Sequence, residues 1–308
     1  MSFDNSNNSK KSDYLANFSP KDRSWDKHRA VAQHVEYLYS RSEFKKYSAR
    51  IGKCSLQLAF SQMFDLETGE FCGIKLQNAF FCRVRSCPVC QWRRSLMWRA
   101  RFHEALPKIL EQHPKSRWIF ATFTVRNCEI TELRKTIQQM NSAWNRLRLR
   151  KEFGVVLGWI KTIEVTQSKD GTAHPHFHVL MQVPPSYFST GYIRQDRWVS
   201  LWAEVMRLDY LPVVDIRAVK AIGDAAKEVL KYAVKADDLV RDKDWLIEYT
   251  KQTYRLRFIS TGGTLKDAFQ PDEKKNDDLI HFTDDSETST DPDLFFGWQR
   301  VEKKYKKD

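Results

Sequence analysis

Residues 175–183 place two histidines, His176 and His178, inside a run that otherwise has the composition of a buried strand. Side chains two residues apart in a strand face the same side of a sheet, so both imidazoles project together while Phe177 between them faces the core. Such a pair offers two nitrogen ligands on a rigid surface. The segment therefore predicts half of a metal site on a sheet. Two surface histidines without an ion are the alternative for an isolated pair.

A second strand, predicted at residues 159–166, supplies the oxygen ligand that a hard divalent cation prefers. Glu164 is its only carboxylate, and turn residues at 168–171 join this strand to the histidine strand as a hairpin. If the residue numbers paired across the hairpin have an even sum, Glu164 lies beside His176 or His178. If the sum is odd, Glu164 lies opposite Phe177 on the other face. We expect the site to bind Mg²⁺ or Mn²⁺, and the imidazoles favour Mn²⁺.

A helix predicted from about residue 224 to residue 238 carries Asp224, Glu228, Tyr232 and Lys235 on one face. An exposed Glu–Lys face with a tyrosine at the edge of the core would give the same pattern. A phenol has a pKa near 10, so its attack at neutral pH needs a neighbouring cation or base. Metal-binding histidines together with a tyrosine flanked by ionisable groups indicate phosphodiester cleavage through a covalent tyrosine intermediate.

Five of the six cysteines lie between positions 54 and 90, and Cys82, Cys87 and Cys90 form a C-x4-C-x2-C pattern. Three close thiols in a reducing compartment predict a four-coordinate structural Zn²⁺ site. Cys54 is the preferred fourth ligand and Cys72 the alternative. Buried free thiols are the competing interpretation. The same block carries basic and aromatic residues suited to DNA phosphates and bases, namely Arg83, Arg85, Trp92, Arg93 and Arg94.

The charge of the chain points to a polyanionic partner. The net charge is +12 and the pI is about 9.3, and lysines and arginines that neutralise phosphates release counterions. The first 24 residues contain no apolar leader core, and no apolar run approaches the roughly 20 residues that cross a bilayer. We therefore expect a cytoplasmic protein with no membrane partner, whose cysteines are reduced or metal-bound.

Strand and helix patterns along the chain indicate an α+β fold with an antiparallel sheet. We expect residues 1–45 to be polar and poorly ordered, 46–95 to form the cysteine-rich module, 96–262 to carry the histidines and the tyrosine, and 263–308 to be a charged, disordered tail. Further strands are predicted at 118–126, 212–219 and 254–259, and helices at 93–106, 133–147 and 198–206, the first ended by Pro107.

Four segments resemble the motifs of one family. His176-Phe177-His178 resembles the HUH signature of single-strand DNA nicking enzymes, in which U stands for a bulky apolar residue. Residues 81–94 (FCRVRSCPVCQWRR), 123–127 (FTVRN) and 228–235 (EVLKYAVK) resemble the remaining motifs of one branch, the rolling-circle replication initiators of small bacterial plasmids. The four segments together cover about residues 50 to 260 in a shared order, which makes the resemblance specific.

The resemblance implies an HUH endonuclease-like fold, with a central antiparallel sheet and flanking helices, preceded by the zinc module. It implies that Tyr232 attacks the DNA, leaving a 5′-phosphotyrosine and a free 3′-hydroxyl. Glu228 would act as general base in termination and Lys235 would stabilise charge. The implied partners are plasmid origin DNA, as a single-stranded or hairpin nick site, a host DNA polymerase and a host helicase, since the chain has no P-loop. The implied location is the bacterial cytoplasm.

Two other functions fit parts of the same pattern. HUH relaxases and single-strand transposases share the histidine–tyrosine chemistry, but relaxases carry a third histidine in the motif and an N-terminal nucleophile, whereas Tyr232 follows the histidines here. A zinc-containing, sequence-specific DNA-binding regulator would need no catalysis. The oligomeric state is open at this point.

Overall fold

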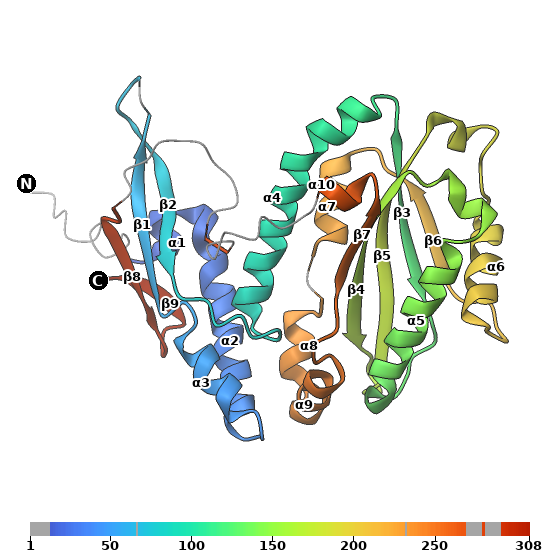
Figure 1. Cartoon of the computed structure of the whole chain (residues 1–308). Coiled ribbons are helices and arrows are strands. Elements are labelled where there is room, and N and C mark those ends of the chain that lie inside the picture. The colour runs from blue at the N-terminus through green and yellow to red at the C-terminus, as the bar shows by residue number, and fades with distance from the viewer. Residues whose placement is uncertain (1–12, 66, 232, 269–278, 281–290) are drawn as a thin grey trace, which may run out of the picture. The chain divides into compact units, whose positions relative to one another are not determined.

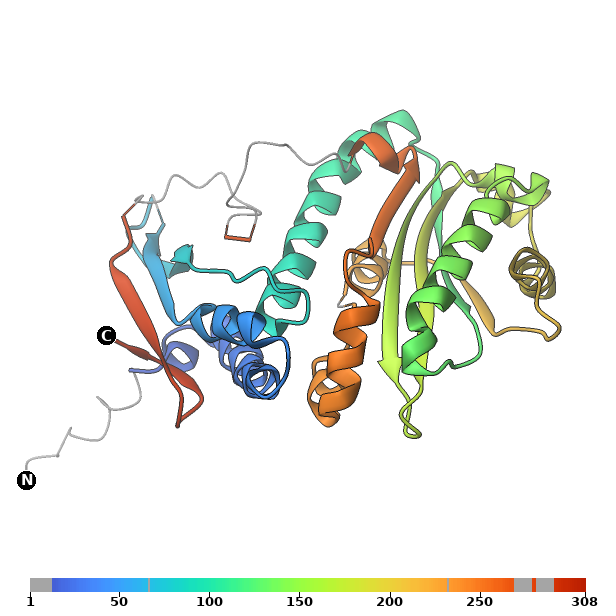
Figure 2. The same cartoon turned by 60° about the horizontal axis from the view of Figure 1, so that its bottom comes forward.

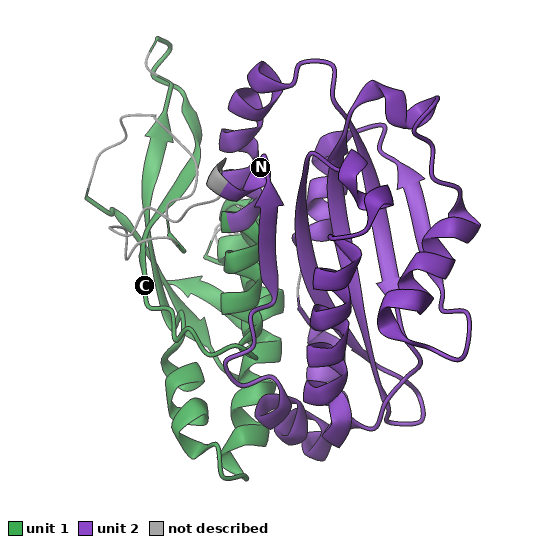
Figure 3. Ribbon diagram, turned by 45° about the vertical axis from the view of Figure 1, so that its right-hand side comes forward, with its two compact units in different colours: residues 1–97, 275–308 green, residues 98–274 purple. Residues whose placement is uncertain are grey.

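The computed structural model describes residues 13–65, 67–231, 233–268, 279–280 and 291–308. The chain forms two compact units (Figures 1 and 3). Unit 1 combines residues 1–97 with residues 275–308, and unit 2 comprises residues 98–274. Unit 1 thus takes in both ends of the chain, and the boundaries fall at 97/98 and 274/275 where the sequence suggested 95/96 and 262/263.

Unit 1 is built on a four-stranded antiparallel sheet with the strand order β2-β1-β8-β9. Its described elements are α1 (Leu15–Phe18), η1 (Pro20–Arg23), α2 (Ser24–Ser40), α3 (Lys45–Lys53), β1 (Gln57–Phe64), β2 (Phe71–Ala79), the start of α4 (Pro88–Gln112), β8 (Leu294–Gln299) and β9 (Lys304–Lys307).

Both chain ends contain regular structure where the sequence suggested little. Trp25, Ala32, Val35 and Tyr39 are buried at helical spacing along α2, within the segment that we expected to be poorly ordered. The last strands come from the segment expected to be a disordered tail, and in β8 the buried Leu294, Phe296 and Trp298 alternate with more accessible residues. The expectation is thus wrong for these residues, because polar composition averaged over 45 residues hid short amphipathic runs.

Unit 2 is built on a five-stranded sheet with the order β6-β3-β5-β4-β7, in which every neighbouring pair is antiparallel. This confirms the predicted α+β class. The remaining elements are β3 (Arg117–Thr124), η2 (Ile130–Glu132), α5 (Leu133–Leu147), η3 (Lys151–Val155), β4 (Gly158–Gln167), β5 (Ala173–Val183), η4 (Pro185–Phe188), α6 (Gln195–Met206), β6 (Val214–Ala218), α7 (Ile222–Val229), α8 (Ala236–Arg241), α9 (Lys243–Gln252), β7 (Ile259–Gly263) and α10 (Leu265–Ala268).

The sheet of unit 2 is covered on both faces by apolar side chains. On one face, Phe123 packs against Trp144 of α5 and Trp202 of α6, with ring centroids 5.9 Å and 5.1 Å apart. Figure 2 shows α5 lying along this face. On the other face, Leu180 of β5 shares a buried cluster with Val229 of α7 and with residues of the 98–112 part of α4. The histidine side chains belong to this second face, where α7 packs against β4 and β5.

Two predicted boundaries in unit 2 differ from the structure. The helix expected to end before Pro107 continues through it to Gln112. A proline inside a helix costs about 3 kcal/mol, but Phe102 and Ile109 are buried in the same cluster on either side and offset that cost. The strand β7 begins at Ile259, whereas the sequence predicted a strand over residues 254–259. Among the residues that the structure describes, no helix is long and apolar enough to span a membrane.

Candidate functional site

Glu164 and the two histidines meet on the sheet of unit 2. The β4–β5 register pairs Glu164 with His176, so the paired positions have an even sum. This is the register in which Glu164 faces the histidines. Glu164 Oε2 lies 2.9 Å from His178 Nε2 and 3.4 Å from His176 Nε2. All three side chains are nearly buried. One carboxylate and two imidazoles therefore form a compact group whose ligand atoms lie within 4.8 Å of one another, close enough to hold one metal ion.

The other ring nitrogens hold the imidazoles in place. His178 Nδ1 lies 3.2 Å from Thr122 Oγ1 on β3, and His176 Nδ1 lies 3.2 Å from the carbonyl oxygen of His174. A contact at Nδ1 fixes the ring orientation and leaves Nε2 as the ligand atom, as in many metal sites. Both Nε2 atoms accordingly face Glu164.

The electrostatics of the group favour the ligand forms of these residues. Burial alone would raise the pKa of Glu164, but the hydrogen bonds to His176 and His178 and the charge of Lys231 outweigh it and hold that pKa below its usual value. Burial lowers the pKa of His178. At neutral pH the group thus contains an ionised carboxylate and a neutral imidazole, which are the forms that bind metal ions.

Lys231 also belongs to this site, and the sequence analysis gave it no role. Its Nζ lies 3.1 Å from Glu164 Oε2 and 2.5 Å from Glu228 Oε1. Burial would lower the pKa of Lys231, but the hydrogen bond to Glu228 and the charge of Glu164 raise it, so the lysine is a cation. A helical wheel could have found it, because at about 100° per residue Lys231 falls about 60° from Glu228, at the edge of the predicted face.

The prediction of one continuous helix over residues 224–238 is correct only as far as Val229. The helix α7 ends at Val229, and α8 begins at Ala236. Tyr232 lies outside the described residues. The face argument for Lys235 fails with the helix, since Lys235 is the exposed N-cap of α8.

The chain on either side of position 232 is bonded to β4. Thr162 Oγ1 donates a hydrogen bond to the carbonyl oxygen of Val229 (2.7 Å), and the backbone N–H of Val165 donates to that of Ala233 (2.9 Å). Val165 also forms a parallel bridge with Val234. Glu164 lies between these two positions of β4, and Lys231, between Val229 and Ala233, is ion-paired with it.

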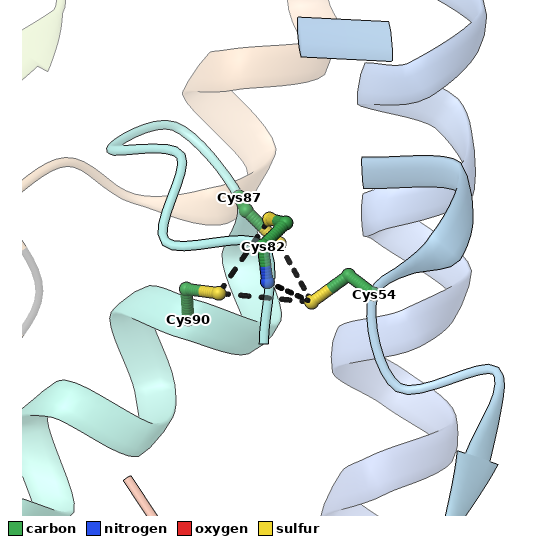
Figure 4. Close-up of side chains that lie close together, drawn as sticks. All are labelled: Cys54, Cys82, Cys87 and Cys90. Carbon is green, nitrogen blue, oxygen red and sulfur yellow. Dashed lines mark hydrogen bonds between the residues drawn. The ribbon is translucent and has the colours of Figure 1, made fainter. Parts of the chain in front are cut away.

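Four cysteine sulfurs converge in unit 1 (Figure 4). Cys54 ends α3, Cys82 follows β2, and Cys87 and Cys90 lie at the start of α4. The Sγ atom of Cys54 lies 3.6 Å from that of Cys90 and 3.7 Å from that of Cys87, and the Sγ atoms of Cys82 and Cys90 are 3.6 Å apart. Tetrahedral zinc with Zn–S bonds of about 2.3 Å requires sulfurs about 3.8 Å apart. The four side chains therefore fit such an ion.

The surroundings of the sulfurs also suit thiolates. The backbone N–H groups of Cys82 and Arg83 donate to the sulfurs of Cys54 and Cys90, at 3.5 Å and 3.3 Å. Burial raises the pKa of the Cys87 thiol, whereas hydrogen bonds from the other three thiols lower that of Cys90. Cys72, the alternative fourth ligand, is exposed and outside the cluster.

Two of the predicted DNA-contacting residues are buried inside unit 1. Trp92 stacks on His28 with ring centroids 4.8 Å apart, and Arg93 donates hydrogen bonds to the carbonyl oxygens of Leu279 and Ile280. The prediction of a DNA-facing role is wrong for these two, because a basic, aromatic helix start does not reveal which of its sides faces the core. Arg83 is exposed, and Arg85 and Arg94 are partly exposed.

Comparisons with known proteins identify the family of this chain. A family model described as "Replication protein" matches residues 73–306. A "Protein rep" of Streptococcus pneumoniae is 31% identical over 300 residues, covering 92% of each chain. A "Protein rep" of Bacillus amyloliquefaciens is 36% identical over 284 residues, covering 80% of this chain and 81% of the relative. No solved structure matches the chain significantly. The chain therefore belongs to the Rep family of plasmid rolling-circle replication initiators.

Proposed function

We propose that this replication initiator nicks one strand of its plasmid origin by attack of the Tyr232 phenol on a phosphodiester. The observation that supports the proposal is the bonding of Val229 and Ala233, three residues before Tyr232 and one after it, to the strand that carries Glu164. Lys231, the residue before Tyr232, is ion-paired with Glu164 itself. A phenol delivered to a metal-binding group is the arrangement that covalent phosphoryl transfer needs.

In the proposed reaction, the phenolic oxygen of Tyr232 forms a bond to phosphorus and the bond from phosphorus to the 3′-oxygen breaks. The products are a 5′-phosphotyrosine and a 3′-hydroxyl, after the leaving oxygen takes up a proton. His176, His178 and Glu164 would hold Mn²⁺ or Mg²⁺, which polarises the scissile phosphate when bound. Lys231 is positioned to offset negative charge, the role that the sequence suggested for Lys235.

Glu228 is suited to termination, in which the bond between tyrosine and DNA is broken. Its side chain is half exposed at the end of α7 and contacts Lys231, so it can take a proton from a water molecule or a hydroxyl group near the phosphotyrosine. That step would release or rejoin the strand at termination. The 3′-hydroxyl would serve a host polymerase as primer, and a host helicase would separate the strands. Arg83, Arg85, Arg94 and Lys235 are candidates for contacts with the DNA backbone.

The cysteine cluster has a structural role in this proposal. Cys54, Cys82, Cys87 and Cys90 would bind Zn²⁺ with all four positions filled by protein ligands, which leaves no open position for chemistry. The ion would join the end of α3 to the start of α4 and so stabilise unit 1.

The test is covalent capture. The full-length protein is incubated with Mn²⁺ and a labelled single-stranded or hairpin oligonucleotide that carries the nick site of its plasmid origin, and the products are separated under denaturing conditions. We expect wild type to form an adduct that maps to Tyr232 and Tyr232→Phe to form none. Tyr254→Phe, at an exposed tyrosine, is the matched control and should react as wild type does. A fully active Tyr232→Phe protein, or a wild type that binds the DNA without any adduct, would refute the proposal.

A further inference from the structure

A pocket of about 530 Å³ opens beside the metal-binding group in unit 2. Its walls come from β3, β5, β6, α7 and the residues between β6 and α7, and they include Phe120, Thr122, Arg217, Lys220, Asp224 and Ala225. The volume lies in the range of sites for small ligands, about 300 to 1,000 Å³. Apart from Thr122, which contacts the His178 ring, none of these residues has a role in the strand cleavage proposed above.

The pocket shares two residues with the proposed reaction site. His178, a candidate metal ligand, and Glu228, the candidate base, both line it. A DNA strand whose phosphate lies at the His178 imidazole therefore has its neighbouring nucleotide at the mouth of this pocket. A base already turned out of a helix is what the pocket would receive, since single-stranded DNA exposes its bases.

The lining offers contacts for both the base and the phosphate of a nucleotide. The Phe120 ring lies 5.5 Å from the His178 ring and gives the pocket an aromatic wall against which a base can pack. Arg217, three-quarters exposed, and Lys220 bring cations to the rim, where they suit phosphate oxygens. Asp215 and Asp224 bring carboxylates, each ion-paired through one oxygen with Arg217 and Lys227 respectively. A carboxylate has two oxygens, so each can still accept hydrogen bonds from the N–H groups of bases.

We propose that this pocket binds the base of a nucleotide adjacent to the scissile phosphate and selects it by type. The inference rests on the proposed nicking function. Carboxylate acceptors favour bases with an exocyclic amino group, namely adenine, cytosine and guanine. Thymine has no amino group, and its single N–H lies between two carbonyl oxygens that repel a carboxylate. The pocket thus contributes one position of the nick-site sequence.

The experiment compares sequence preference in wild type and in a variant with a filled pocket. A randomised single-stranded DNA pool is incubated with Mn²⁺ and full-length protein, and the covalently captured strands are sequenced. Ala225→Leu fills the pocket while keeping a good helix former in α7. Gln139→Leu, at an exposed position of α5, is the matched control.

Wild type and Gln139→Leu should enrich the same motif, with thymine depleted by about tenfold at one position next to the nick. Ala225→Leu should lose the preference at that position only. Asp224→Asn should weaken the discrimination against thymine. Ala221→Leu, which fills the pocket from the exposed residue before α7, provides a second test in case Ala225→Leu does not fold.

The outcomes separate the two proposals. A wild type that captures no DNA at all would refute the nicking function itself. Capture of an unchanged motif by folded Ala225→Leu and Ala221→Leu proteins would leave nicking intact and overturn the pocket assignment. Binding of Mn²⁺ by both variants at the wild-type affinity shows that the metal ligands are undisturbed, so a lost preference would then belong to the pocket.

Discussion

The ammonium of Lys231 lies 3.1 Å from Glu164 Oε2, the same oxygen that lies 2.9 Å from His178 Nε2. The residue directly before Tyr232 is thus ion-paired to the carboxylate of the candidate metal group. This ion pair and the two hydrogen bonds to β4 hold Val229, Lys231 and Ala233 next to the site. The ion pair also means that a lysine cation and a metal ion would share one anionic oxygen.

Lys231→Met separates the effect of the lysine charge on metal binding from its effect on strand cleavage. Loss of the ammonium removes a positive charge next to the metal group, so we expect Mn²⁺ to bind several-fold more tightly. Adduct formation should slow by about a hundredfold, because a charge-stabilising donor is lost. Titration with Mn²⁺ by electron paramagnetic resonance and single-turnover capture measure the two quantities. Lys227→Met, at an exposed lysine paired with Asp224, is the control. Weaker Mn²⁺ binding by Lys231→Met would contradict this view.

Glu164→Gln tests the oxygen ligand. The amide keeps the size of the side chain but removes the charge, so Mn²⁺ affinity should fall by about tenfold or more, and adduct formation should need correspondingly more metal. Calorimetric titration with Mn²⁺ measures the affinity. Asp224→Asn removes an exposed carboxylate outside the metal group and should bind Mn²⁺ as wild type does. Equal affinities in wild type and Glu164→Gln would exclude Glu164 as a ligand.

Cys54→Ser and Cys72→Ser distinguish the two candidates for the fourth zinc ligand. Cys54→Ser should lower the bound zinc measured by elemental analysis and reduce the thermal stability of the protein, because a structural ion contributes folding free energy. Cys72→Ser should keep one zinc per chain and the wild-type melting temperature, since Cys72 is exposed. Loss of zinc from Cys72→Ser but not from Cys54→Ser would reverse the assignment.

Lys161 predicts a pH dependence of stability. It is buried in β4, its Nζ donates to Asn141 Oδ1 at 2.6 Å and lies 3.8 Å from the Phe177 ring centroid. Burial lowers its pKa from 10.5 to about 7. Between these values the unfolded chain binds more protons than the folded chain, so this residue makes wild-type stability rise with pH across the window. Below pH 7 the lysine is charged in both states and the cost of burial is complete.

Lys161→Met should therefore stabilise the protein at pH 6, by an amount on the order of 3 kcal/mol. The gain should shrink as the pH rises toward 10. Urea denaturation of both proteins across this range measures the difference. A gain that does not change with pH would show that the lysine is not the titrating group.

Much of the site could be predicted because strand periodicity is a local property. The alternation around His176 and His178 gave the shared face, and Glu164 was the only carboxylate in the strand predicted to pair with them. The register that joins them was one of two possibilities, and the structure has the even one. The cysteine spacing likewise indicated a cluster, and Cys54, at the end of α3, is the fourth residue of the cluster in the structure.

The sequence by itself determined the face of the histidine strand, the class of the fold and the family. Tertiary structure decided the course of the chain between α7 and α8. Helical periodicity continued through residues 230–235, but the carbonyl groups of Val229 and Ala233 bond to β4. Hydrogen bonds to a distant strand have no trace in local sequence, and they bring Lys231, rather than Lys235, to Glu164.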